Sequence, residues 1–119
     1  MGDRSKRTVG DMYGLVVRFE LKEGHEEAFD RPASETIEKI TAKEPGTLAY
    51  IAHRVPSFPN TRIFYELYAD EAAFAAHEDG AHTRQFLAER ANHLRREPEV
   101  TFVSSGVGVV RDGVRLDGK

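Results

Sequence analysis

The fold is decided by residues 62–78, Arg-Ile-Phe-Tyr-Glu-Leu-Tyr-Ala-Asp-Glu-Ala-Ala-Phe-Ala-Ala-His-Glu. The spacing of the hydrophobic residues changes half-way along this stretch. From Ile63 to Leu67 every second residue falls on the same face, which is the pattern of a β-strand. Asp70 is then a typical N-cap residue, and the alanine-rich segment behind it fits a short helix that ends near Glu78. The stretch therefore predicts a strand at 62–69 that leads directly into a helix.

The same reasoning, extended in both directions, predicts a split β-α-β arrangement. Further strands are expected at 13–22, 47–55 and 99–110, and further helices at 25–43 and 82–95. Pro32 predicts a kink or an irregular first turn in the first helix, because proline lacks an N–H group and clashes with the preceding turn. This order of elements is the ferredoxin-like one, an α+β fold whose antiparallel sheet carries its helices on one face.

The chain has 119 residues, the size of one domain. We expect a flexible N-terminal tail at 1–11, a single domain at 12–110 and a C-terminal tail at 111–119. Asp and Glu number 20 against 17 Lys and Arg, so the net charge of −3 offers no basic surface for nucleic acid. Cysteine is absent, which excludes disulfides, Cys-ligated zinc and thiol nucleophiles.

No segment contains the ~20 consecutive apolar residues that a membrane helix needs. The basic residues near the N-terminus are not followed by the apolar region of a signal peptide. We therefore expect a cytoplasmic protein that has no membrane partner.

The strands carry apolar or aromatic side chains on both faces, as in the neighbouring pairs Leu15 and Val16, or Phe64 and Tyr65. One layer of helices covers only one face of a sheet. The second apolar face needs a cover, and the sheet of another copy is the simplest one. The pattern therefore predicts a homodimer.

Acid–base chemistry in a chain without cysteine falls to histidine and carboxylate side chains. His77 and His82 flank the break between the two C-terminal helices, Glu66 lies near the end of the third strand, and His53 lies near the end of the second. We expect these four side chains to converge at one end of a cleft between sheet and helices, where a carboxylate fixes the tautomer of an imidazole that moves a proton. The alternative is that both helix-end histidines only bond local backbone.

A bound metal or nucleotide is not expected. No His-x-x-x-His pair lies on a continuous helix, and Gly106-Val-Gly108 is not followed by a helix that could bind phosphate. Six aromatic side chains are candidates to line a cavity for an aromatic ligand, although each of them also fits a plain hydrophobic core. They are Phe19, Tyr50, Phe64, Tyr68, Phe74 and Phe86.

Several segments resemble the antibiotic biosynthesis monooxygenase family over about residues 13–104. They are Glu-Gly-His-Glu-Glu-Ala-Phe after the first strand, Glu-Pro-Gly-Thr-Leu-Ala-Tyr before the second, the run from Phe64 through Glu66 and Phe74 to His77, and His82-x-x-x-Phe86. The resemblance implies a dimeric α+β barrel built from two ferredoxin-like protomers. It also implies oxidation of a quinol or of a polycyclic, polyketide-like phenol by O₂, without flavin, haem or metal as cofactor. The positions that match the family motif are Glu66, His77 and His82.

Two departures from the family narrow the function. A haem-degrading branch carries Asn, Trp and a haem-ligating His at the positions that hold Val17, His77 and Leu87 here, so haem degradation is not expected. The tryptophan of some polyketide oxygenases is absent as well. Three functions therefore stay open: a cofactor-independent monooxygenase in antibiotic biosynthesis or quinol oxidation, a non-catalytic protein that binds an aromatic ligand or acts as a pathway scaffold, and a non-redox polyketide cyclase or isomerase.

Overall fold

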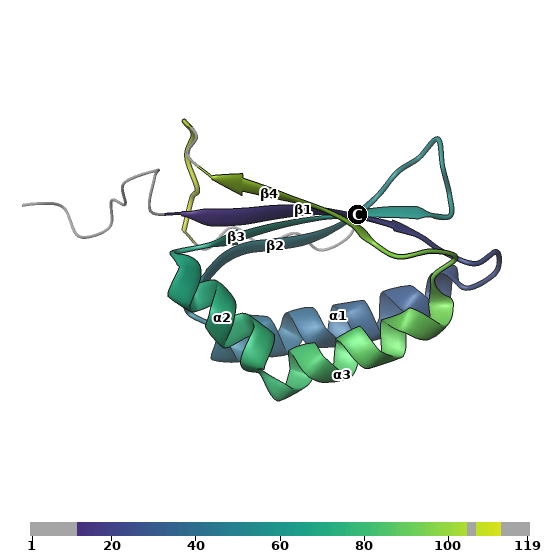
Figure 1. Ribbon diagram of the computed structural model, residues 1–119, viewed down its shortest axis with the longest axis horizontal. Helices are drawn as coiled ribbons and strands as arrows, with labels where there is room; N and C mark the ends of the chain where they lie inside the picture. The colour runs from purple at the N-terminus through teal and green to yellow at the C-terminus, as the bar shows by residue number, and fades with distance from the viewer. Residues whose placement is uncertain (1–11, 105–106, 113–119) are drawn as a thin grey trace, which may run out of the picture.

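The computed structural model describes residues 12–104 and 107–112, and it has the expected ferredoxin-like α+β architecture (Figure 1). The expected tail at 1–11 and most of the expected tail at 111–119 lie outside the described residues. The strands are β1 (Tyr13–Glu20), β2 (Thr47–Arg54), β3 (Thr61–Tyr68) and β4 (Glu99–Ser104). The helices are α1 (Glu26–Lys43), α2 (Glu71–Asp79) and α3 (Ala81–Arg90), and the 3₁₀ turn η2 (Ala91–His93) follows α3.

The four strands form one antiparallel sheet in the order β2-β3-β1-β4. Glu66 of β3 lies opposite Leu15 of β1 on one side and opposite Tyr50 of β2 on the other. Leu15 in turn lies opposite Phe102 of β4. Because directly opposed residues of a sheet share a face, these four side chains form one row across the face that the helices cover.

All three helices lie on that one face of the sheet, as Figure 1 shows. The core between the two layers is largely aromatic. The rings of Phe19 and Phe64 are 4.8 Å apart, and those of Phe29 and Phe86 are 5.9 Å apart; all four side chains are at most 3% exposed. Burial of one such side chain stabilises the fold by about 1.5–3 kcal/mol, so this cluster holds the helix layer on the sheet.

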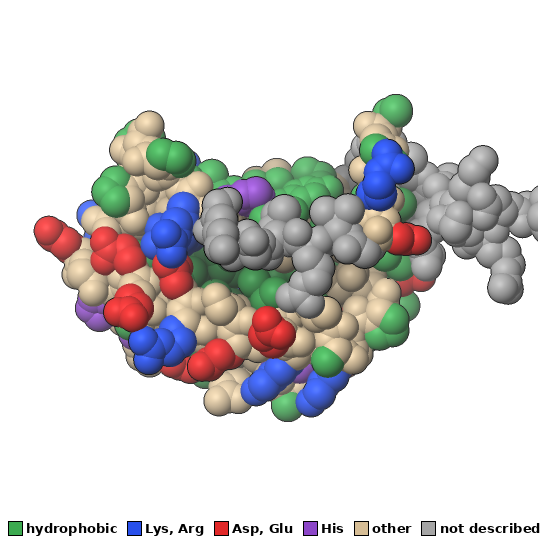
Figure 2. Space-filling model, turned by 180° about the vertical axis from the view of Figure 1, so that it is seen from behind, with side chains coloured by type: hydrophobic (Ala, Val, Ile, Leu, Met, Phe, Trp, Pro, Cys, Tyr) green, Lys and Arg blue, Asp and Glu red, His purple; other side chains and the backbone are tan. Residues whose placement is uncertain are grey.

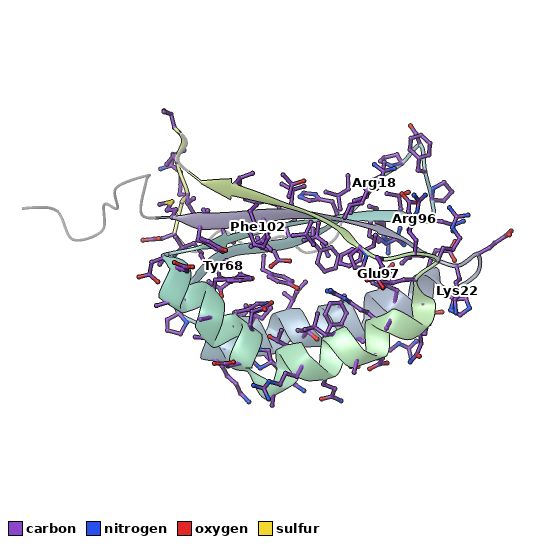
Figure 3. All side chains as sticks on the ribbon, in the orientation of Figure 1. Arg18, Lys22, Tyr68, Arg96, Glu97 and Phe102 are labelled. Atoms are coloured by element: carbon purple, nitrogen blue, oxygen red, sulfur yellow. The ribbon has the colours of Figure 1, made fainter. Side chains whose placement is uncertain are left out.

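None of the described helices covers the opposite face of the sheet. Val16, Ile51, Ile63 and Tyr65 lie on this open face and are half-buried. The β2–β3 loop and residues 107–112 both project on this side (Figure 1), and Figure 2 shows hydrophobic side chains gathered between the two projections. In Figure 3, Arg18 also projects from the open face, whereas Tyr68 lies between the sheet and the helices.

Two expected elements were too long at their C-terminal ends. The helix expected at 82–95 begins at Ala81 and ends at Arg90. It does not extend to residue 95 because the chain beyond η2 pairs with the end of β1: Leu94 forms a β-bridge with Leu21, and Arg95 N–H donates to Glu20 O. The strand expected at 99–110 ends at Ser104, since that residue lies opposite Tyr13, where β1 begins. Of the residues expected to continue this strand, 107–110 are described and are not in a strand.

Two smaller differences lie near the first helix. β1 ends at Glu20 rather than at residue 22, since Leu21 keeps only the bridge to Leu94. α1 begins at Glu26 and continues through Pro32, which is buried within it. Within the described residues, no helix is both long enough and apolar enough to cross a membrane.

Candidate functional site

A cavity of about 220 Å³ lies between the helix side of the sheet and helices α2 and α3. The row of Leu15, Glu66, Tyr50 and Phe102 that crosses the sheet contributes to its lining. Both apolar and ionisable side chains line the rest. They are Val17, Thr36, Phe74, His77, Glu78, Thr83, Phe86, Leu87, Arg90 and Val100.

Glu44, which follows the last residue of α1, organises the two histidines beside the cavity. Its Oε1 atom lies 2.8 Å from His77 Nδ1 and accepts a 2.7 Å hydrogen bond from the Thr47 hydroxyl, while its Oε2 atom is bonded to His82 Nε2. Gly80 separates helix α2 from helix α3, so that the two histidines approach the same carboxylate from either side. All three side chains are at least nine-tenths buried.

The Glu44 carboxylate is held in its ionised form. Burial raises its pKa, but the hydrogen bonds from Thr47, His82 and His77 outweigh burial and leave the pKa below its usual value. An ionised carboxylate can only accept hydrogen bonds, so His77 carries its proton on Nδ1. In the neutral imidazole this leaves Nε2 with a free lone pair, as a general base requires.

Glu66 is the second buried carboxyl group of the site, and it lies in the floor of the cavity. The Tyr68 hydroxyl donates a 2.6 Å hydrogen bond to Glu66 Oε1. Burial raises the pKa of Glu66, and the Tyr68 hydrogen bond and the electrostatic interactions with His77 and Arg90 offset this only in part. A carboxyl group with a raised pKa beside a cavity can exchange a proton with a ligand at moderate pH.

Two tyrosines flank this acid–base group. The rings of Tyr50 and Tyr68 lie 5.4 and 5.3 Å from the His77 ring. Burial, followed by the charge of Glu66, raises the pKa of both phenols, so each keeps its proton. Neither tyrosine is therefore a base: Tyr50 forms part of the cavity wall, and Tyr68 donates its hydrogen bond to Glu66.

The structure brings together three of the four acid–base residues predicted from the sequence. Glu66 and His77 line the cavity, and His82 meets the same carboxylate as His77 but does not line the cavity itself. His53 does not join them: it lies opposite Ile63 on the open face of the sheet and is exposed. That expectation was wrong, because the residue falls on the opposite side of the strand from Tyr50 and Ala52.

The carboxylate that orients the histidines was also misidentified. Glu66 bonds Tyr68, and Glu44 bonds the histidines. Glu44 is not among the site residues predicted from the sequence, although it opens the Glu-Pro-Gly-Thr-Leu-Ala-Tyr segment on which the family resemblance partly rests. Arg90 was a second omission, since nothing in its sequence position separates it from the exposed arginines.

The six aromatic candidates divide into two groups. Tyr50, Phe74 and Phe86 line the cavity. Phe19, Phe64 and Tyr68 are fully buried in the core behind it. The hydroxyl of Tyr68 nevertheless acts on the site through Glu66.

Within the described ranges, no group of three or more His, Asp or Glu side chains is arranged to hold a metal ion. The two histidine nitrogens beside the cavity are each bonded to a different oxygen of Glu44. Beside the aromatic-lined cavity, His77 and Glu66 can exchange protons with a ligand.

Comparison with known proteins agrees with this architecture. A candidate antibiotic biosynthesis monooxygenase from Nitrosomonas europaea has the same fold, with a TM-score of 0.75 and 23% identity over 81% of this chain and 91% of that one. Another, from Caulobacter crescentus, has a TM-score of 0.78 and 20% identity over 84% of this chain and 94% of that one. NE2512, a protein of unknown function from Nitrosomonas europaea, has a TM-score of 0.74 and 27% identity over 88% of this chain and 99% of that one.

No curated protein matches the chain in sequence. The family model described as "Antibiotic biosynthesis monooxygenase" matches residues 12–89. This segment runs from the start of β1 almost to the end of α3, and it includes Glu44, Glu66 and both histidines of the site. The chain therefore belongs to the antibiotic biosynthesis monooxygenase family.

Proposed function

We propose that the protein is a small monooxygenase that oxidises a quinol or a related phenol with O₂ and needs no cofactor. The observation that carries the proposal is His77, a cavity-lining imidazole whose Nδ1 proton is fixed by the ionised carboxylate of Glu44. Aromatic walls from Tyr50, Phe74 and Phe86 suit a flat ring. Family membership supports the same class of chemistry.

In the proposed reaction, Nε2 of His77 removes the proton from a substrate hydroxyl. The resulting phenolate is electron-rich and supplies its own electrons to O₂. For a quinol, one oxygen atom is inserted into a ring C–H bond to give C–OH and the other leaves as water, so that quinol and O₂ give a hydroxyquinone and one molecule of water. The quinol supplies all four electrons, and the protons on Glu66 and His77 are available for the departing oxygen.

The cavity volume favours a small substrate. Pockets for drug-sized ligands span about 300–1,000 Å³, and this cavity has about 220 Å³. A ligand of one or two fused rings suits this volume better than a tetracyclic one. Phe102 and Val100 of the edge strand β4, which line the cavity, are 59% and 46% exposed, so this is its most accessible side.

We also propose that the protein is a homodimer through the open face of the sheet. Apolar side chains of that face, including Val16, Ile51 and Tyr65, are only half-buried within one chain, and Val103 on β4 is 40% exposed. A second sheet would remove this surface from water. Light scattering at micromolar concentration should give twice 13.4 kDa, and the monomer mass would refute the proposal.

The test of function is oxygen uptake by chelator-treated protein offered simple quinols and anthrone-type phenols. We expect uptake above the autoxidation blank, and a loss of about 10²-fold or more in His77→Ala if His77 is the base. His93→Ala, whose histidine lies outside the cavity, is the matched control and should retain full activity. Equal rates for His77→Ala and wild type would refute His77 as the base, and ligand binding without any uptake would favour the non-catalytic alternative.

A further inference from the structure

Arg90, the last residue of α3, borders the cavity with a guanidinium group that has no anionic partner among the residues that the structure describes. Its guanidinium carbon lies 4.8 Å from the centre of the Phe19 ring and 5.6 Å from that of Phe86. In the part of the chain that the structure describes, the group takes part in no hydrogen bond and no ion pair. No fully buried polar side-chain atom there lacks a partner, so the nitrogens of Arg90 are accessible.

The surroundings of Arg62 show how this chain satisfies a buried arginine. Arg62 is 4% exposed and donates two hydrogen bonds of 2.9 and 3.0 Å to Asp30, with two more to the backbone carbonyls of Pro59 and Thr61. Such fork-shaped pairing with a carboxylate is the usual arrangement for a guanidinium away from water. Arg90 is half-buried and has no such carboxylate among the described residues, so its accessible N–H groups are free to bind another anion.

The carboxylates around the cavity do not fill this role. Glu66 is bonded to Tyr68, and Glu78 is exposed at the edge of the cavity. Both act on Arg90 only as charges beyond ion-pair distance, and burial lowers the pKa of the guanidinium. Within residues 12–104 and 107–112, the Arg90 guanidinium is therefore a cation beside two aromatic rings, and its N–H donors have no acceptor.

Arg90 and the proton-exchanging groups lie toward different ends of the cavity. Glu66 is level with Leu15 on β1, and His77 contacts Tyr50 and Tyr68 at the same level of the sheet. Arg90 packs on Phe19, four residues further along β1, so the strand positions beside the two groups are about 13 Å apart at about 3.3 Å per residue. Because Arg90, Glu66 and His77 all line the same cavity, one flat ligand can contact them at different edges.

We propose that Arg90 binds an anionic oxygen group, either a carboxylate or an ionised phenol, at the edge of an aromatic ligand opposite the one that faces His77 and Glu66. As a statement about the substrate this rests on the proposed function, and it defines the substrate class as an aromatic phenol with an acidic group at its far edge. The guanidinium, which lies close to the rings of Phe19 and Phe86, offers paired N–H donors to such an oxyanion.

The test uses ligands that the proposed chemistry does not consume. Titration calorimetry compares 2-naphthoate with its neutral counterpart 2-naphthamide, and visible spectroscopy follows the ionisation of bound 4-nitrophenol. We expect the wild type to bind naphthoate about tenfold or more tightly than naphthamide if the anion is a carboxylate, or to lower the pKa of bound nitrophenol if it is a phenolate. Arg90→Gln should abolish whichever preference is observed.

Arg84→Gln is the matched control, because Arg84 lies on the same helix, is exposed and pairs only with Asp79. Arg90→Lys keeps the charge and should retain part of the preference, and thermal unfolding checks that each variant is folded. Two results would overturn the inference. The first is equal affinity for 2-naphthoate and 2-naphthamide together with an unchanged pKa of bound 4-nitrophenol. The second is no binding of either anion at millimolar concentration. Arg90-dependent binding without oxygen uptake would refute only the proposed function, whereas uptake that is indifferent to Arg90→Gln and to acidic substituents would refute only the inference.

Discussion

Replacement of Glu44 by glutamine tests whether this buried carboxylate holds the α1 end, the β2 start and the α2–α3 junction together. Glu44 accepts hydrogen bonds from Thr47, His77 and His82 and is 9% exposed at its side chain. In Glu44→Gln, the amide oxygen can still accept from Thr47 and His77, without the charge. The amide nitrogen then faces His82, which must change its tautomer to become an acceptor.

The expected cost follows from this count of bonds. A hydrogen bond to a charged group contributes about 1.5–3 kcal/mol, and loss of the charge roughly halves it. Two weakened bonds and one rearranged bond therefore amount to about 2–3 kcal/mol of the free energy of unfolding. At about 2.1 cal/mol/K per residue, the entropy of unfolding of 119 residues is about 0.25 kcal/mol/K, so Tm should fall by about 8–12 °C.

Thermal unfolding followed by far-ultraviolet circular dichroism, at one fixed protein concentration, measures this loss. Because the pKa of Glu44 is lowered in the folded state, its contribution is complete above its ordinary value of 4.5 and is lost as the pH falls through the folded-state value. The difference between the proteins should therefore shrink below pH 4.5. Glu27→Gln, in an exposed pair with Arg31, should cost less than about 0.5 kcal/mol. An equally small effect of Glu44→Gln at pH 7 would refute the reasoning.

Three further substitutions test other parts of the structure. Glu66→Gln keeps an acceptor for Tyr68. Because burial raises the pKa of Glu66, its ionisation destabilises the wild-type protein as the pH rises through the folded-state pKa. In urea titrations from pH 4 to 8 the variant should therefore gain stability relative to wild type, and a difference that stays constant with pH would contradict this. Gly46→Ala would place a Cβ atom 2.7 Å from that of Ala73 and should cost about 1–3 kcal/mol by thermal unfolding, whereas Gly108→Ala, with nothing within 4 Å, should be neutral. Arg62→Met removes both bonds to Asp30 and should cost about 3–5 kcal/mol in the same assay; a loss below 1 kcal/mol would show that the pair is dispensable.

The elements of the fold could be predicted from local patterns because each one repeats its signal many times. The alternation at 62–69 and the N-cap at Asp70 fixed the β3–α2 junction to within about a residue: Asp70 accepts from Ala73 N–H as a cap should. The ends of α3 and β4 could not be read in this way. They depend on partners distant in sequence, since β1 supplies the pairing that ends one element at Arg90 and the other at Ser104.

The candidate site was predictable in its residue types but not in its contacts. His77 and His82 were identified by their position at a helix break, and both are buried there. Their partner could not be chosen from the sequence, because Glu44 lies 33 residues before His77 and Glu66 only 11 before it. His53 failed for a simpler reason: a period of two separates the faces of a strand, and the residue is one position out of phase with Tyr50 and Ala52.

The position of Glu44 also explains why the site needs two histidines. The carboxylate has two oxygens, and a single bond to His77 would leave the other oxygen buried and unsatisfied in a site where burial disfavours its charge. His82 satisfies that oxygen from the far side of Gly80 without entering the cavity. Its role is then to keep Glu44 ionised and fixed, so that His77 presents one tautomer to a ligand. On this argument His82→Gln, which can still donate to Glu44, should retain most of the turnover that His77→Ala loses, and a loss equal to that of His77→Ala would mean that the proton passes through His82 as well.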